Sequence, residues 1–189
     1  MTVSVQKLKQ VIQVIITTRG SVSKTGLLKL LFIVDEYAIK HTGEPITDLD
    51  YKIWQHGPVA ESVFNDIESN SIELDDGFEM VKSDKRIHFK RTSQERPNTD
   101  LLSQIEDTLM SYALDEVSGI RDTDLVTYLH SDESLWKKQA EALGILESLE
   151  SKTGLRATDY SIDFKELIEG NDRLMSNYLR YQENASCFR

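Results

Sequence analysis

The sequence is poor in the residues that build covalent or metal-stabilised sites. Its 189 residues include one cysteine, Cys187, so no disulfide can form within the chain. The four histidines, His41, His56, His88 and His130, are widely separated, and none forms a pair at the spacing of helical zinc ligands. We therefore expect no metal and no cofactor. A chain of this length buries roughly 70% of its unfolded surface and needs no such staple.

Long apolar runs are also absent. No stretch reaches the ~18 residues that a membrane-spanning helix requires. The first ten residues, MTVSVQKLKQ, lack the basic-then-apolar layout of a secretory signal. Together with the single cysteine, these absences favour the reducing cytoplasm and no membrane partner. Hydrophobic residues make up 39% of the chain and charged residues 29%, which excludes a disordered chain.

The sequence contains none of the common catalytic signatures. Phosphate-binding loops, the glycine-rich dinucleotide fingerprint and the serine nucleophile elbow are all missing. No residue set with a nucleophile and its base is evident. We therefore do not expect an enzyme.

Positive charge is scarce in the second half of the chain. The net charge is -10 at pH 7, and residues 1–91 contain 12 Lys or Arg against 13 Asp or Glu. Residues 92–189 contain 10 against 19. Because DNA-binding chains concentrate positive charge on a face, direct binding to nucleic acid is not expected. The acidic half either attracts a basic protein partner or simply favours solubility.

Helical periodicity dominates what the sequence does contain. An amphipathic helix is predicted around residues 8–16, ended by Gly20. Ser23 is the expected N-cap of a second helix, which ends at Gly43 before Pro45. Apolar residues occupy two stripes of this second helix, so we expect it in the middle of the domain.

The remaining elements are shorter. Leu49, Tyr51 and Ile53 alternate as an extended run, and Pro58 suits the first position of the next helix. A β-hairpin is predicted over 78–89, with its turn at 83–85. After a polar connector at 92–99, helices are predicted with these apolar residues: Leu102, Ile105, Leu109 and Tyr112; Leu125, Val126 and Leu129; Leu135, Trp136, Ala140 and Leu143; and Leu174, Met175, Tyr178 and Leu179.

The predicted fold is mainly α with a small β component (α+β): a compact helical domain with a short extended run and a β-hairpin. We divide the chain into a main domain at residues 1–154 and a C-terminal helical extension at 155–189, since Lys152, Thr153 and Gly154 interrupt the helical pattern.

Asp35 is the most unusual single placement, because it lies on an apolar stripe of the second helix. An unpaired buried carboxylate is costly, so it must find donors or change its protonation state. It is either a polar anchor of a binding site or a carboxylate that organises the core.

Two aromatic segments are further candidates. Tyr51, Trp54, His56, Gly57 and Pro58 place aromatic and imidazole rings beside a rigid turn, either as a partner-binding surface or as a folding device.

His130 and Trp136 flank a predicted junction between two helices. His130 is either a titratable group of a site or a bridge between those helices.

Several of these residues together resemble the Panacea domain, the domain of SocA-like antitoxins and of phage-associated GepA-like proteins. The resemblance covers about residues 5–148 and is carried by the following: Lys24-Thr25, Leu28-Lys29-Leu30-Leu31, Asp35, Gly43, Pro45-Ile46, Tyr51, Trp54, Gly57-Pro58-Val59, and Leu125 to Trp136. Phe32 and His56 depart from the family pattern, which often has Tyr at both places.

The resemblance implies a bacterial, non-catalytic antitoxin that binds a cognate protein toxin, with some members acting as adaptors that deliver the toxin to a protease. The family residues that become candidates for partner binding are Lys24, Asp35, Tyr51, Trp54, His56, Gly57, Pro58, His130 and Trp136. Two alternatives remain open: a winged-helix-like transcriptional regulator, which the net charge disfavours, and an enzyme that joins Asp35, His56 and His130 in one cleft. The oligomeric state is not predicted.

Overall fold

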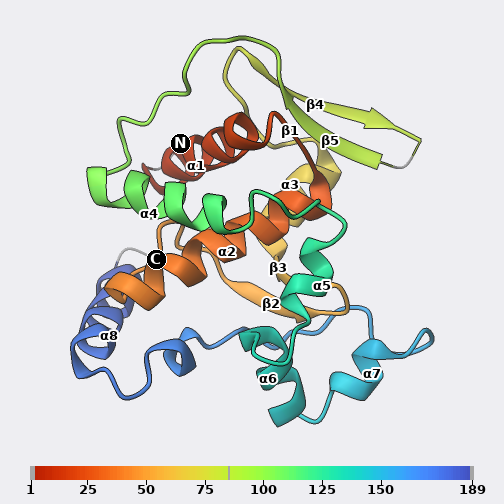
Figure 1. The fold of residues 1–189 in the computed structure, drawn as a ribbon, viewed down its shortest axis with the longest axis vertical. Helices are drawn as coiled ribbons and strands as arrows, with labels where there is room; N and C mark the ends of the chain where they lie inside the picture. Colours follow the sequence, from red (N-terminus) through yellow and green to blue (C-terminus); the bar gives the residue numbers. More distant parts are fainter. Residues whose placement is uncertain (1–2, 85, 188–189) are drawn as a thin grey trace.

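The computed structural model describes residues 3–84 and 86–187, and the chain is mainly helical with two small antiparallel sheets (Figure 1). The predicted fold class is therefore confirmed. In chain order the elements are α1 (Val3–Arg19), β1 (Ser21–Ser23), α2 (Lys24–Thr42), β2 (Tyr51–Trp54), β3 (Gly57–Ala60), α3 (Glu61–Ser69), β4 (Phe78–Ser83), β5 (Arg86–Arg91), α4 (Gln104–Glu116), α5 (Leu125–Leu129), α6 (Leu135–Ala142), α7 (Leu146–Glu150), the 3₁₀ helix η1 (Phe164–Ile168) and α8 (Asp172–Cys187).

Helix α2 is the centre of the fold. It begins where the Ser23 hydroxyl accepts a hydrogen bond from the Gly26 N–H, and it ends at Gly43, whose φ is 80°. Both predicted caps are confirmed. Most of its residues are buried on all sides, because α1, α4, α8, η1 and β3 pack around it. The two apolar stripes therefore face different neighbours in one core.

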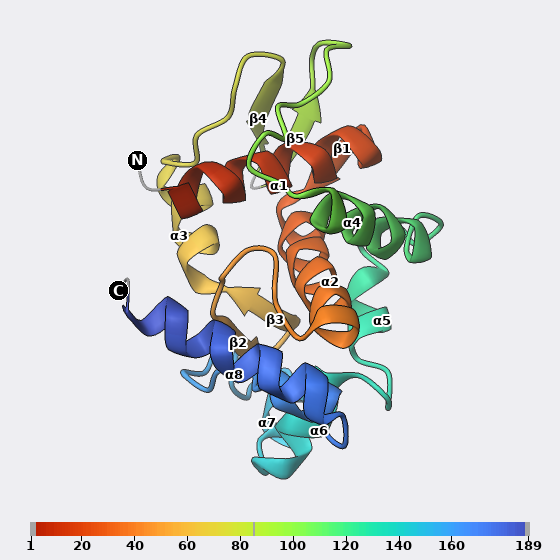
Figure 2. The same cartoon turned by 90° about the vertical axis from the view of Figure 1, so that its left-hand side faces the viewer.

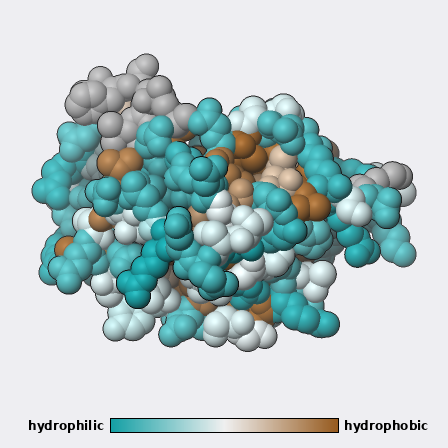
Figure 3. Space-filling model, turned by 90° about the horizontal axis from the view of Figure 1, so that it is seen from above, coloured by the Kyte–Doolittle hydropathy of each residue, from teal (hydrophilic) through white to brown (hydrophobic). Residues whose placement is uncertain are grey.

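The larger sheet has the strand order β1-β5-β4. The β4–β5 hairpin is confirmed, with Met80 opposite Phe89, while Lys85 of its predicted turn lies outside the described residues. Strand β1 was not predicted, because three residues between two helices are too short for a period of two to show. Seen from above, the surface is mostly hydrophilic, and hydrophobic side chains are exposed in limited areas (Figure 3).

The prediction that Pro58 begins a helix is wrong. Residues Gly57–Ala60 form β3, which pairs with β2 so that Ile53 lies opposite Pro58, and α3 begins only at Glu61. The fixed φ of proline suits a strand as well as a first helical turn, and a two-stranded hairpin does not require its missing N–H. The hairpin thus continues the predicted extended run through a turn and back.

Helix α4 is present, but the predicted apolar face is only partly the buried one. Its buried residues are Met110, Ala113 and Leu114, which pack toward α2. Ile105 is 65% exposed and Tyr112 is 59% exposed. The helix carries two apolar stripes, and packing on α2 uses the one that periodicity did not single out.

Residues beyond 154 lie along the main body. The Ile53 N–H donates to the carbonyl oxygen of Tyr160, and the Gln55 N–H donates to that of Arg156. The Ile162 N–H donates to the carbonyl oxygen of Tyr51. Helix α8 lies beside the C-terminal end of α2 (Figure 2), where the Asn177 side chain donates to the Thr42 carbonyl oxygen at 2.8 Å. The proposed domain boundary at 154 stays a prediction.

Among the described residues, no helix combines the length and the apolar character needed to cross a membrane.

Candidate functional site

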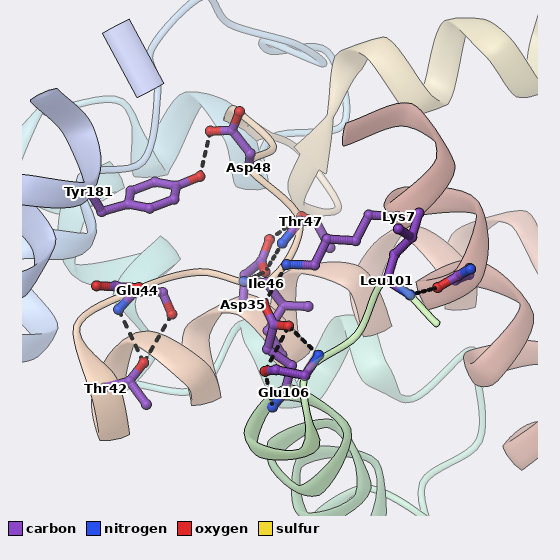
Figure 4. Close-up of polar contacts among 12 residues, drawn as sticks. Lys7, Asp35, Thr42, Glu44, Ile46, Thr47, Asp48, Leu101, Glu106 and Tyr181 are labelled. Carbon is purple, nitrogen blue, oxygen red and sulfur yellow. Dashed lines mark hydrogen bonds and ion pairs between the residues drawn. The ribbon is translucent and has the colours of Figure 1, made fainter. Parts of the chain in front are cut away.

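Asp35 is fully buried on α2, and four donors surround its carboxylate. The Ile46 and Thr47 N–H groups donate at 2.8 and 2.9 Å, and the Thr47 hydroxyl donates as well (Figure 4). The Tyr51 hydroxyl is the fourth donor, at 2.8 Å. Burial raises the pKa of Asp35, and these hydrogen bonds act in the opposite direction. The carboxylate therefore fastens the segment after Gly43 to α2 and has its acceptor positions filled by the protein.

The β2–β3 hairpin places most of the remaining candidates. Tyr51 is fully buried, with its ring edge-on to Phe32 at 5.2 Å. Gly57 follows the turn with φ of 95°, a conformation that favours glycine, and Gly57 and Pro58 are buried. His56, at the turn itself, is exposed. Within this hairpin, solvent therefore reaches the imidazole far more than the Gly-Pro backbone.

Lys29 lies directly beneath this hairpin and was not among the predicted site residues. Its side chain is buried on α2, and its Nζ donates to the Pro58 carbonyl oxygen at 2.8 Å. Burial lowers the pKa of Lys29 to about 7. A Cβ atom on Gly57 would lie 3.3 Å from Lys29 Nζ, so the glycine also leaves room for the amine. The sequence contains one indication of this role, which is that Lys29 is a cation placed among the apolar stripes of α2.

His130 and Trp136 pack against the same hairpin. Their rings stack with centroids 3.9 Å apart, and Trp136 Nε1 donates to the Trp54 carbonyl oxygen at 3.0 Å. Burial, followed by the nearby charges of Lys29 and His56, lowers the pKa of His130 to about 4, so its ring is neutral near pH 7. His130 Nε2 is buried without a hydrogen-bond partner among the described residues. Its position is 3.8 Å from where a Gly57 Cβ would lie.

Lys24 belongs to the neighbouring surface between α2 and α3. Its ammonium forms an ion pair with Glu68 and lies 4.3 Å from the ring centroid of Phe64. The Phe64 ring packs edge-on against Trp54 at 5.0 Å. Lys24 is thus linked to the hairpin through two aromatic rings rather than directly.

The structure brings the candidates together around one hairpin. Trp54, Gly57 and Pro58 meet Lys29, His130 and Trp136, whereas Tyr51 turns to Asp35 on α2. In residues 3–84 and 86–187, no group of three or more His, Cys, Asp or Glu side chains is placed to hold a metal ion. These contacts fix the β2–β3 hairpin on the central helix α2, and most side chains of the hairpin face inward.

Comparison with known proteins gives one finding. The model of a family described as "Antitoxin SocA-like, Panacea domain" matches residues 27–137. The match includes all the predicted site residues except Lys24, and it also includes Lys29 and α4. No curated protein and no solved structure matches the chain.

Proposed function

Because the chain belongs to the family of SocA-like antitoxins with a Panacea domain, we propose that it binds a cognate protein toxin directly and neutralises it, as in a type II toxin–antitoxin pair. The family match over residues 27–137 carries this proposal. In this role the protein acts in the bacterial cytoplasm, makes no covalent bond and requires no cofactor. A phage-associated gene is one setting in which such a pair operates.

The burial of the family residues supports a division of labour within the domain. Asp35, Tyr51 and Trp136 are fully buried, and their polar atoms bond to other parts of the same chain. Side chains used in this way cannot also form a docking surface. We therefore infer that the segment from Asp35 to Val59 mainly holds the scaffold through its buried side chains, and that exposed side chains of the domain select the toxin.

Growth rescue tests the proposed function. The intact chain is co-expressed with the product of the adjacent gene, whose expression alone is expected to arrest growth. Rescue together with co-purification of the two proteins supports neutralisation by binding. Rescue without co-purification, or no rescue, contradicts it.

The amount of toxin in the rescued cells separates two modes of neutralisation. Direct blocking leaves the toxin present in a complex with this chain. Delivery to a protease, the adaptor role implied for some members, lowers the toxin level, and this loss disappears when the protease is deleted.

A further inference from the structure

We propose that the toxin docks in the groove between α2 and α4, through a basic segment that carries apolar anchor side chains. This inference rests on the proposed function and names the surface that performs it. We call the groove and its rim the α2–α4 strip, defined by Tyr37, Ile105, Leu109 and Tyr112.

The shape of the α2–α4 strip is that of a docking groove. It has a volume of about 400 Å³, with Tyr37 and His41 on one side and α4 on the other. Ile105, Leu109 and Tyr112 stand at positions i, i+4 and i+7, so they form one continuous stripe along α4. The buried face of α4 already packs on α2, and the stripe is therefore a second apolar face that the fold leaves open.

The exposed side chains are of the kind that dominate binding energies. Tyr112 is 59% exposed and Ile105 is 65% exposed, whereas large apolar residues are normally covered when they line a helix at this period. Tyr37 is held in place because its ring stacks on His41 at 4.2 Å. Tyrosines fixed before binding lose little conformational entropy on contact.

The charges around the strip determine what kind of partner it fits. Helix α4 contains four acidic residues and no basic residue. Glu106 is paired with Lys7 (Figure 4), and Asp107 lies on the side of α4 away from the stripe, two residues from both Ile105 and Leu109. Asp115 and Glu116, three and four residues after Tyr112, lie on the side of the stripe, are exposed and form no ion pair among the described residues. On the α2 side Lys40 pairs with Glu36, so the strip is left with the unpaired carboxylates of Asp115 and Glu116, which attract a basic partner and speed its capture.

A third tyrosine extends the acidic surface toward α5. Tyr128 is 42% exposed, and burial followed by the charges of Glu36 and Glu116 raises the pKa of its hydroxyl. Glu36 already pairs with Lys40, while Glu116 has no such partner among the described residues. Tyr128 of α5 therefore lies near the acidic groups Glu36 of α2 and Glu116 of α4.

Other occupants fit this surface less well. A second copy of the chain would bring the same acidic rim to a twofold interface, where like charges face one another. Nucleic acid would be repelled by the same carboxylates. A basic protein segment fits both the acidic rim and the apolar groove, since its charges complement the rim and its apolar side chains enter the groove.

A second groove offers a useful contrast. It lies between α1 and α3, has a volume of about 340 Å³ and is lined by Val5, Leu8 and Ile72, among others. Lys9, Asp66 and Glu73 also line it, and Lys9 pairs with Asp75, so this groove carries charges of both signs. Val5, which is 48% exposed there, serves as a matched control position.

The experiment measures the affinity of the intact chain for the purified product of the adjacent gene. The double variant Ile105→Ser/Tyr112→Ser removes the anchors, and Asp115→Lys/Glu116→Lys reverses the charge of the rim. The matched control is Val5→Ser/Tyr160→Ser, with a valine and a tyrosine exposed elsewhere. Each strip variant is expected to weaken binding by about tenfold or more, because central anchors and their charges carry most of the energy. The control is expected to remain within about twofold.

Equal binding by the wild-type chain and both strip variants overturns the inference and leaves the proposed function intact. Failure of the wild-type chain to bind contradicts the proposed function, and a second probe then decides the inference. This probe is a helical peptide of lysine and leucine, compared with the same peptide carrying glutamate for lysine. Preferential binding of the basic peptide that the strip variants lose, and the control keeps, supports the strip. Binding that does not distinguish the variants overturns it.

Sedimentation tests whether a second copy of the chain occupies the strip. If the wild-type chain forms dimers that Ile105→Ser/Tyr112→Ser dissociates, the strip is a self-association surface and the inference is overturned. A wild-type chain and variants of the same mass support it.

Discussion

At the scale of the residue, two ionisable side chains on α2 are buried by different means. Asp35 is surrounded by four donors from residues 46–51, so its desolvation is offset by hydrogen bonds. Lys29 has one acceptor, the Pro58 carbonyl oxygen, and burial shifts its pKa to about 7. The first group anchors a loop, while the second holds a strand and is close to losing its charge at neutral pH.

Asp35→Asn is expected to lower the free energy of unfolding by about 1–3 kcal/mol. Asparagine replaces one of the two acceptor oxygens with an NH₂ group, which is a donor. At least one of the donors from Ile46, Thr47 and Tyr51 would therefore lose its acceptor. Urea denaturation measures the change, and Asp50→Asn, at an exposed carboxylate, is the matched control and should stay within about 0.5 kcal/mol. A stable Asp35→Asn variant would show that the cluster contributes little.

Lys29→Met is expected to change how stability depends on pH. The pKa of Lys29 falls from its ordinary value of 10.5 to about 7 in the folded chain, so the unfolded chain binds more protons between these values. Wild-type stability therefore rises relative to the variant by about 1 kcal/mol per pH unit as the pH rises from 7 toward 10, and the difference is constant below 7. Urea denaturation across this range checks it, with Lys138→Met at an exposed position as control. Parallel pH profiles for the wild type and Lys29→Met would contradict the prediction.

At the scale of the element, the start of α2 depends on a residue from the segment between α4 and α5. The Asp122 carboxylate accepts the Ser23 N–H at 2.6 Å and pairs with Arg19 at 3.3 Å. Arg19 also donates to the carbonyl oxygens of Val117 and Ile120. The end of α1, the cap of α2 and the end of α4 are thereby joined at one point.

Gly26→Ala is expected to destabilise the chain by about 1–3 kcal/mol, through overpacking at this point. A Cβ atom there would lie 2.6 Å from Asp122 Oδ2, so the carboxylate would have to leave Ser23 and Arg19. Gly119→Ala is the control, since nothing lies within 4 Å of its Cβ position, and it should be neutral or slightly stabilising. Thermal unfolding of both variants measures the difference, and equal melting temperatures would refute this account of the α2 start.

At the scale of the whole molecule, the segment after residue 154 completes the core. Its buried residues are Ile162, Phe164, Ile168, Leu174 and Tyr178. Phe164 stacks on Phe32 of α2 at 5.5 Å, and Asn177 bonds to the carbonyl oxygen of Thr42. Although this segment lies outside the family match, it covers the same central helix.

A chain shortened to residues 1–154 is therefore expected to lose its cooperative unfolding transition. The five lost apolar side chains account for stabilisation on the order of 10 kcal/mol, comparable with the net stability of a domain. Circular dichroism during heating and binding of a hydrophobic dye measure the loss. A cooperative transition at the wild-type temperature would instead support an independent domain at 1–154.

Local signals predicted much of this fold and less of the site. Ser23, Gly43 and the 78–89 hairpin were predicted correctly because a cap or a turn depends on residues near in sequence. Strand β3 was missed because Gly57–Ala60 is too short to show a strand period and its proline also suits a helix start. The role of Lys29 was missed because its acceptor, the Pro58 carbonyl oxygen, is distant in the sequence. Asp35 was singled out, with hydrogen bonds from Tyr, His or backbone N–H groups as one interpretation, but the particular donor residues were not predicted.

The sequence by itself determined a helical domain, a central apolar helix, an acidic second half and the resemblance to the Panacea family, because these follow from composition, periodicity and local motifs. Only the tertiary structure decided which stripe of α4 is buried, and that Ile105 and Tyr112 remain exposed. The sequence of a helix with two apolar stripes does not indicate which stripe a neighbouring element will cover. That choice is made when α2, α4 and the C-terminal segment pack around one core.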